Sequence, residues 1–249
     1  KKLFTDNTFW GARERLQRML SEITTNSNYV PLLKEWNGES TKGNTAQGFY
    51  LMWVDEIMSL VLNSHMTSTE QEQFCTSSLY WKFATKIIDN PHSEWWNNSR
   101  SKIFQTAFDS TLQYFLKNYG DNQDGSSWQW GKIHTLTFEH PLGKVKPLNW
   151  IFNIGPFPID GGYQVPNAFR HALCKKNFKV TSGPSTRRIV DFQNPQEAYG
   201  VLPTGNSGVP FSKHYKNQVQ LFLNGSLRSE TMNWEKIKTF SDKLELLAN

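Results

Sequence analysis

Cysteine and long apolar runs are scarce in this sequence. Cys75 and Cys174 are the only cysteines among 249 residues, and no Cys-x-x-Cys pair occurs. One disulfide is possible, although the sequence does not establish it, and a metal site of four thiolates is excluded by count. The longest apolar candidate, Ile57–Leu62, contains Ser59 and falls far short of the ~20 residues that cross a bilayer. We therefore expect no membrane span.

A basic stripe is also absent. The chain has 27 Lys and Arg against 22 Asp and Glu, a formal net charge of +5. The basic residues are scattered, and the longest runs are pairs such as Lys175-Lys176 and Arg187-Arg188. Nucleic-acid-binding proteins usually gather basic side chains on one face, with aromatics between them. We therefore expect no nucleic acid partner.

Aromatic residues, by contrast, are abundant. The chain contains 10 Trp, 17 Phe and 8 Tyr. Such side chains supply much of the apolar area of a core, and they also form walls for aromatic or acyl ligands. The composition allows both interpretations and favours the ring-rich core.

The first 120 residues are predicted to be helical. Apolar residues recur at spacings of three and four along a segment capped by Asp6 or Thr8, and again over Thr45–Asn63 and Ser101–Tyr119. A weaker pattern covers Ser77–Ile88 and stops before a proline.

The composition changes to turn formers at Asp121–Gly125. Beyond it, short β-branched or aromatic runs at Leu148–Ile154, Asn177–Thr181 and Arg188–Phe192 are bounded by Gly, Pro and Asn, which indicates strands. The expected class is α+β, with a helical region at 1–120 and a strand-rich region at 121–249.

Asp121–Gly125 also suggests a calcium loop, because oxygen-bearing side chains alternate before a glycine. The glycine comes one position too early, and Lys132 occupies the position where a bidentate Glu is required. A plain turn is therefore predicted, and no metal ligand is assigned in this chain.

Two histidines invite a metal or acid-base interpretation. His134 and His140, the latter beside Glu139, are six residues apart, and on an extended strand they would lie ~20 Å from each other. One ion does not bridge that distance without a fold-back, so we expect structural histidines.

Cys174, Ser207 and His214 could form a nucleophile and base. Gly205-Asn206-Ser207-Gly208 falls short of the Gly-x-Ser-x-Gly elbow, and no apolar strand leads through it into a helix. Gly205 and Gly208 are instead predicted to need a positive φ or a close backbone approach. A thiol enzyme using Cys174 is a further possibility, and it requires sensitivity to alkylation.

Six segments occur in a fixed order: Trp128 to His134 (Trp-x-Trp-Gly-x-x-His), His140 to Gly143 (His-Pro-Leu-Gly), Gly161-Gly162, Gly183 to Asp191 (Gly-Pro-Ser-x-Arg-x-Ile-Val-Asp), Leu202 to Gly208 (Leu-Pro-x-Gly-x-Ser-Gly) and His214 to Gln218 (His-Tyr-x-x-Gln). Their order and spacing resemble the carboxy-terminal part of the catalytic chain in the penicillin amidase family. Upstream, Leu33 to Gly38 is similar to that family's Leu-x-x-Trp-Asp-Gly, so the resemblance covers nearly the whole chain. Lys216-Asn217 and Tyr163–Asn167 depart from the family pattern, which leaves the subfamily open.

The resemblance implies an amino-terminal-nucleophile (Ntn) hydrolase. Such enzymes cut a precursor so that a Ser begins the catalytic chain and attacks an amide carbonyl, with its own α-amino group as the base. Lys1 is not that nucleophile, and Gly125-Ser126-Ser127-Trp128 lacks the Asn of a processing site. The first residues lack an initiator Met and a signal peptide, which suggests a processed or excised piece of something longer. No catalytic residue is therefore assigned here, and the substrate-binding residues stay unknown.

The resemblance further implies that these helices flank an αββα sandwich whose sheets the later strands complete. Arg187 is expected at a strand start, in a buried or interface ion pair. No cofactor is expected in this chain, because calcium in family members is held by residues upstream. The expected partners are the upstream part of the precursor, which carries the nucleophile Ser, and a small acyl amide; the expected location is periplasmic or secreted.

The function expected is hydrolysis of acyl amides, such as β-lactam side chains or acyl-homoserine lactones, through an acyl-enzyme on a Ser upstream of this chain. The alternative is a noncatalytic module that binds a ligand or a partner. The two differ in whether the gene continues upstream into a Ser-Asn segment.

Overall fold

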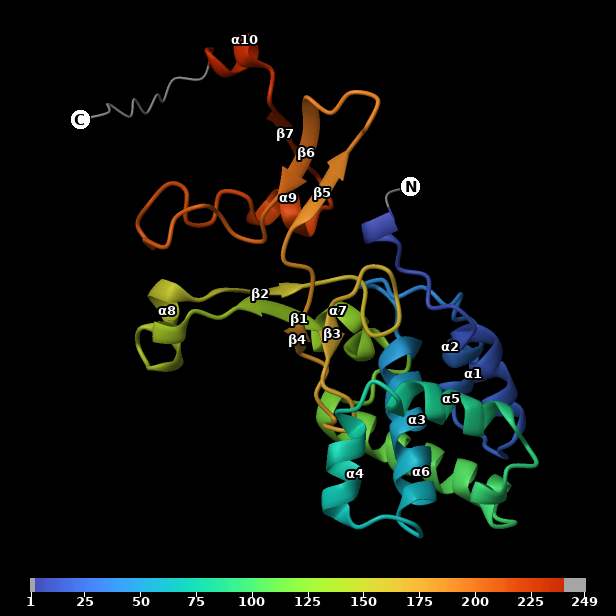
Figure 1. The fold of residues 1–249 in the computed structure, drawn as a ribbon. Helices are drawn as coiled ribbons and strands as arrows, with labels where there is room; N and C mark the ends of the chain where they lie inside the picture. The colour runs from blue at the N-terminus through green and yellow to red at the C-terminus, as the bar shows by residue number, and fades with distance from the viewer. Residues whose placement is uncertain (1–2, 240–249) are drawn as a thin grey trace. The chain divides into compact units, whose positions relative to one another are not determined.

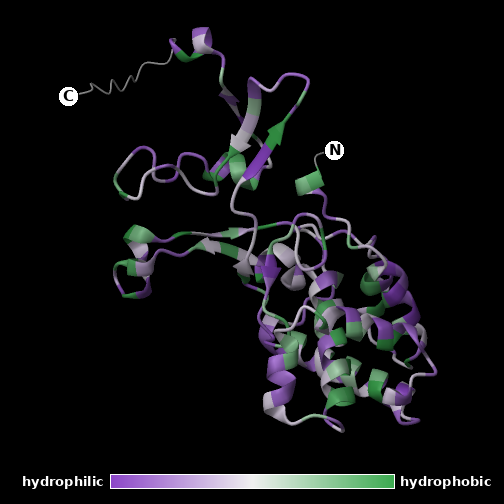
Figure 2. Cartoon of the chain, viewed as in Figure 1, coloured by the Kyte–Doolittle hydropathy of each residue, from purple (hydrophilic) through white to green (hydrophobic). Residues whose placement is uncertain are grey.

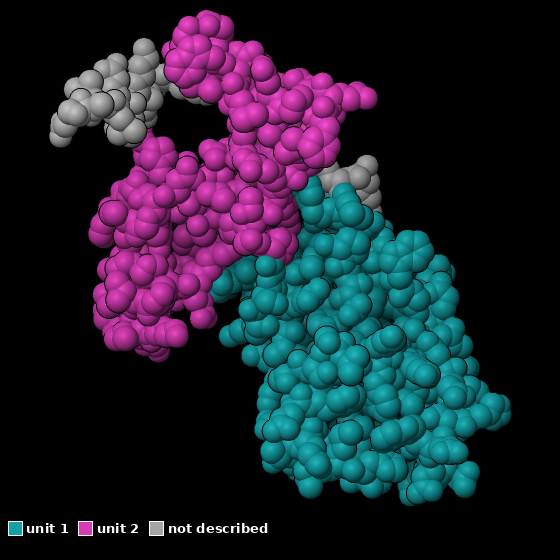
Figure 3. Space-filling model, in the orientation of Figure 1, with its two compact units in different colours: residues 1–137, 155–183 teal, residues 138–154, 184–249 magenta. Residues whose placement is uncertain are grey.

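The computed structural model describes residues 3–239, and these form two compact units. The described part of unit 1 comprises residues 3–137 and 155–183, and that of unit 2 comprises residues 138–154 and 184–239 (Figures 1 and 3). The predicted boundary at residue 121 separates a helical region from a strand-rich one. The two units are defined differently, by which residues pack together. Lys1, rejected above as a nucleophile, lies outside the described residues.

Unit 1 is built around one helix that is apolar on nearly all sides. Helix α3 (Ala46–Leu62) packs against α6 (Arg100–Tyr119), which crosses it in Figure 1. A helix with so wide an apolar surface is stable only when other elements surround it. The surrounding helices are α1 (Ala12–Ser21), α2 (Val30–Lys34), α4 (Ser68–Cys75), α5 (Tyr80–Asp89) and α7 (Trp130–Ile133).

The strongly periodic helices are confirmed, and the weaker predictions need correction. Helices α3 and α6 match the predicted spans to within one residue, and α5 begins three residues later than predicted. The first helix begins at Ala12 rather than beside Asp6, because Asp6 accepts hydrogen bonds from Thr8 in a preceding turn. Helix α4 was missed, although its Thr67 and Glu70 form a reciprocal capping box.

Two small sheets lie mainly in unit 1, whose bounds leave out Phe138 and Ile154 of the first sheet. Strand β1 (Thr135–Phe138) pairs with β2 (Ile154–Pro158), and β3 (Arg170–His171) pairs antiparallel with β4 (Val180–Ser182). The predicted strand at Asn177–Thr181 overlaps β4. The loop between β3 and β4 lies beside α3 and α4, and it carries Cys174.

Unit 2 contains an antiparallel sheet in the order β5-β6-β7. Its strands are β5 (Arg187–Val190), β6 (Glu197–Val201) and β7 (Arg228–Thr231), and its helices are α8 (Asn149–Phe152), α9 (Val219–Leu223) and α10 (Trp234–Ile237). Figure 2 shows β5 changing from hydrophilic to hydrophobic along its length. The predicted strand at Leu148–Ile154 is wrong, because the turn of α8 occupies most of it. The predicted order, with helices in the first part of the chain and strands in the later part, is confirmed.

Candidate functional site

In unit 1, two of the resembling segments, Trp128 to His134 and Gly161-Gly162, are joined by a hydrogen bond. The Trp130 indole donates to Gly161 O at 2.8 Å, and the Gly131 amide donates to Lys42 O at 2.9 Å. Gly161 has a φ of 92°, and a Cβ there would lie 2.1 Å from Asn167 O. The Trp36 indole donates to Glu39 O, which fixes the turn after α2. These residues therefore position the chain.

His134 lies inside this arrangement as a buried residue. Its ring stacks on Trp130 at 4.2 Å, and its Nδ1 lies 2.6 Å from Phe178 O. His171 lies 6.1 Å from it, edge to face. Burial lowers the pKa of His134 to about 4 and that of His171 to about 3, with His134 contributing to the second shift. Both rings are neutral at pH 7. His140, in unit 2, accepts a hydrogen bond from the Leu142 amide.

In unit 2, Gln218 joins two of the resembling segments. Its side chain accepts from the Leu202 amide at 3.0 Å and donates to Asn206 Oδ1 at 2.9 Å. Gly205 makes the predicted close approach, because a Cβ there would lie 1.9 Å from His214 O. The same prediction is wrong for Gly208, which has no atom within 4 Å of a Cβ and no positive φ.

The three candidate nucleophile and base residues are engaged elsewhere. Cys174 forms a disulfide with Cys75, so the thiol-enzyme interpretation is wrong. Ser207 Oγ accepts from the Val209 amide, and the His214 ring contacts Asn217. Within residues 3–239, the Ser207 and His214 side chains share no hydrogen bond.

Arg187 begins β5 as predicted and is buried. Its guanidinium donates to Phe222 O at 2.6 Å and lies over the Phe222 ring at 4.5 Å. Burial lowers its pKa. These contacts tie β5 to α9 inside unit 2.

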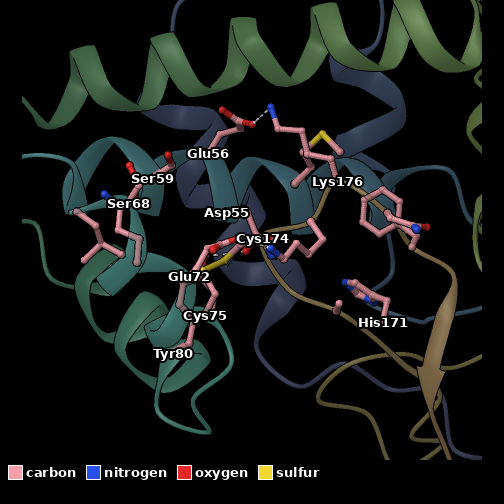
Figure 4. A pocket seen from close by; sticks show the side chains of 17 residues that line it. Asp55, Glu56, Ser59, Ser68, Glu72, Cys75, Tyr80, His171, Cys174 and Lys176 are labelled. Atoms are coloured by element: carbon pink, nitrogen blue, oxygen red, sulfur yellow. Dashed lines mark hydrogen bonds and ion pairs between the residues drawn. A yellow bond between two sulfur atoms is a disulfide. The ribbon is translucent and has the colours of Figure 1, made fainter. Parts of the chain in front are cut away.

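The candidate binding site is a pocket of about 250 Å³ in unit 1 (Figure 4). Its walls come from α3, α4, Tyr80 and residues 171–178. The Cys75–Cys174 disulfide holds the 171–178 segment against α4, with the two Cα atoms 6.2 Å apart. The pocket therefore depends on two segments that are distant in sequence.

Asp55 is the central charged group of this pocket. Its Oδ1 accepts from the Tyr80 hydroxyl and its Oδ2 from the Cys174 amide, each at 2.8 Å. Burial raises the pKa of Asp55 to about 6, while these two hydrogen bonds lower it and Glu56 raises it further. A carboxylate in such surroundings binds a cation or a proton more readily than a solvated one.

Among residues 3–239, no group of three or more His, Cys, Asp or Glu side chains is arranged to hold a metal ion. No helix in that part of the chain is long and apolar enough to span a membrane.

Known proteins resemble the chain along nearly its whole length. A family model described as penicillin amidase matches residues 1–239. The chain belongs to the penicillin amidase family. The six segments that resemble the family are therefore family segments. Those whose contacts are given above position the chain through backbone contacts and buried side chains.

The relatives of this penicillin amidase chain are longer than the chain itself. It is 32% identical over 169 residues to acyl-homoserine lactone acylase QuiP of Pseudomonas syringae pv. syringae, which covers 64% of this chain and 20% of that protein. It is 31% identical over 162 residues to QuiP of Pseudomonas fluorescens, covering 62% and 19%. The chain thus spans about a fifth of the length of these curated relatives.

The fold agrees with this membership. The thermostable penicillin G acylase from Alcaligenes faecalis matches with a TM-score of 0.52 at 13% identity, over 98% of this chain and 47% of that chain. The predicted α+β class, as part of an Ntn-hydrolase fold, is confirmed.

Apart from the two cysteines, sequence reasoning missed the pocket residues of this penicillin amidase chain. Asp55 and Glu56 interrupt the otherwise apolar sequence of the predicted helix after Val54, and that interruption was a usable signal. Tyr80 and His171 gave none, because each sits in a short segment whose neighbours across the pocket come from distant positions.

Proposed function

We propose that this chain is the carboxy-terminal portion of an amidohydrolase that cleaves acyl amides, such as β-lactam side chains or acyl-homoserine lactones. The observation that carries this is the penicillin amidase match over residues 1–239. Relatives named acyl-homoserine lactone acylases favour the second substrate class.

The nucleophile of the proposed reaction is a Ser upstream of this chain. Its hydroxyl attacks the amide carbonyl, its α-amino group takes the proton through a water, and the acyl-enzyme is then hydrolysed. An Asn side chain and backbone N–H groups upstream stabilise the oxyanion. The engagement of Cys174 in a disulfide and of Ser207 with Val209 supports a nucleophile outside the described residues.

The proposed role of the chain itself is to support and shape the catalytic part. Unit 2 exposes Phe192 at 90%, Phe211 at 87% and Trp150 at 81% of their surface. Such exposure is typical of surfaces that another chain segment covers. The proposed partner is the upstream part of the precursor, and the proposed location is periplasmic or secreted, as the family resemblance implies.

The test compares residues 1–249 alone with the same residues coexpressed with their natural upstream sequence. Both are assayed on fatty and aromatic acyl amides, including acyl-homoserine lactones. We expect hydrolysis only when the upstream sequence is present. Hydrolysis by residues 1–249 alone would place the nucleophile inside this chain and overturn the proposal.

A noncatalytic binding module is the second candidate, and the pocket around Asp55 favours it. It predicts no hydrolysis in either preparation, and a gene that does not continue upstream into a Ser-Asn segment.

A further inference from the structure

The carboxylate of Asp55 faces the unit 1 pocket with two of its acceptor positions still open. A carboxylate offers about four lone-pair sites, and Tyr80 and Cys174 use one on each oxygen. Asp55 lies deep in the unit but retains accessible surface, and it lines the pocket. A ligand in the pocket therefore reaches the open sites.

The charges that line the pocket do not cancel. Three acids line it, Asp55, Glu56 and Glu72, against two lysines, Lys175 and Lys176, so the sum is 2 − 3 = −1. Glu56 pairs with Lys176 at 2.5 Å, and Glu72 pairs with Lys175 at 2.6 Å.

The remaining negative charge belongs to Asp55, which has no ion pair within the described residues. His171 also lines the pocket, but it is neutral because burial lowers its pKa to about 3. The lysines do not supply the missing cation. Each is half-exposed, and each is already held by a glutamate from α3 or α4.

The other walls are apolar and the space is small. Met52, Leu62 and Phe178 line the pocket beside the disulfide. A volume of about 250 Å³ equals that of roughly eight water molecules in the liquid, so it suits a ligand with a similar number of heavy atoms. A ligand that fits both features has one cationic group and a short hydrocarbon part.

We propose that this pocket binds a small primary ammonium ion, with its cationic group on Asp55 and its hydrocarbon part against Met52, Leu62 and Phe178. Ammonium donors form charge-assisted hydrogen bonds to the two open sites of the carboxylate. The hydrocarbon part removes apolar wall from water. The inference does not depend on amide hydrolysis.

The test is a calorimetric titration of the protein expressed from its complete gene with n-pentylammonium chloride, beside 1-pentanol as a neutral ligand of similar shape. We expect the ammonium ion to bind and the alcohol to bind at least roughly tenfold more weakly, because it lacks the charge. Asp55→Asn is expected to weaken ammonium binding by a similar factor. Asp109→Asn, which removes an exposed carboxylate on α6, is the matched control and keeps wild-type affinity.

A second readout is the pH dependence of ammonium binding. The groups facing Asp55 are Glu56 on α3, Glu72 on α4, Tyr80 on α5, and His171, Lys175 and Lys176 on the segment between β3 and β4. Burial raises the pKa of Asp55 to about 6, so affinity falls as the pH drops below that value. Circular dichroism checks that each variant is folded.

Three results would overturn the proposal: no ammonium binding, equal binding of the alcohol, or unchanged binding by a folded Asp55→Asn variant. Unchanged binding by the folded Asp55→Asn variant would also mean that the ammonium ion binds elsewhere in the protein. Loss of ammonium binding in a folded Asp55→Asn variant supports this site, and that result is read without any assay of amide hydrolysis.

Discussion

The two units of this chain differ in how far they bury their aromatic residues. In unit 1, Phe49, Trp53 and Phe108 are fully buried and contact one another's rings. In the described part of unit 2, Phe192 and Phe211 are almost fully exposed. Unit 1 thus carries its own core, whereas unit 2 has a surface suited to cover by other protein. The exposed large apolar residues of the described chain all belong to unit 2, apart from Leu3, Trp10 and Leu79.

Truncating one ring in each unit tests this contrast most strongly. Phe108→Ala is expected to lower the free energy of unfolding of unit 1 by about 3–5 kcal/mol, because it leaves a cavity beside Phe49 and Trp53. Phe211→Ala, the matched change in unit 2, should stay within about 0.5 kcal/mol in residues 1–249 alone. Native-state hydrogen exchange reports each unit separately. Equal effects would remove the distinction between the units.

The disulfide is the next way to weaken unit 1 selectively. The double variant Cys75→Ser, Cys174→Ser releases the 171–178 segment from α4, and the cross-link closes a loop with a sequence separation of 99. We expect unit 1 to lose about 2–4 kcal/mol, mainly because the unfolded chain gains freedom. Unit 2 should be unchanged in hydrogen exchange. A reductant should affect the wild-type protein and leave the double variant as it was.

The contrast also explains which parts of the fold the sequence predicted. Helices α3 and α6 were found because the unit 1 core imposes long, regular apolar periods on them. In unit 2, short segments receive their conformation from distant partners. Leu148–Ile154 has a strand-like composition, yet α8 forms there, and the Asn153 side chain accepts from the His140 amide and donates to Gly143 O.

The site was less predictable than the fold. The family segments could be recognised by their order, but the pocket depends on α3, α4 and residues 171–178 coming together. The pairing of Cys75 with Cys174 was only a possibility in the sequence, because a single pair of cysteines does not reveal whether their Cα atoms are close. His171 pairs spatially with His134, a neighbour that spacing alone did not suggest.

Acid is expected to weaken unit 1 through its two buried histidines. In the unfolded chain they bind protons below about pH 6.5. In the folded chain burial lowers the pKa of His134 to about 4 and of His171 to about 3, so stability falls as the pH drops from 6.5. Asp55 acts in the opposite direction, because burial raises its folded pKa to about 6 and acidification below that value favours the folded state.

The two histidines outweigh Asp55. We expect the histidines to cost about 3 kcal/mol and Asp55 to return about 1 kcal/mol between pH 6.5 and 5, a net loss of about 2 kcal/mol in unit 1. His171→Phe should remove about 1.5 kcal/mol of this loss, measured by denaturant unfolding at both pH values. The exposed His92 provides the control, and His92→Leu should leave the dependence on pH unchanged. A wild-type protein whose unit 1 is equally stable at both pH values would contradict the burial of these rings.

The smallest effect is expected from the polar contacts that hold unit 2 together. Gln218 is buried, and it satisfies the Leu202 amide and Asn206 Oδ1 at once. Gln218→Leu keeps the apolar stem but leaves those two groups without their partner, which costs about 1–3 kcal/mol. Faster exchange of the Leu202 amide and proteolysis between residues 202 and 218 would report the opening.

Gln220→Leu is the matched control for this change, because Gln220 lies two residues along and is exposed. It should leave both readouts unchanged. If Gln218→Leu destabilises residues 1–249 alone but has little effect once the upstream sequence is present, then other protein that covers unit 2 replaces the lost contacts. The two units would then differ because unit 2 depends on a partner for its stability. If the loss of stability is the same in both preparations, the 202–218 segment depends on Gln218 and not on other protein. Unit 2 would then be more stable on its own than its exposed rings suggest.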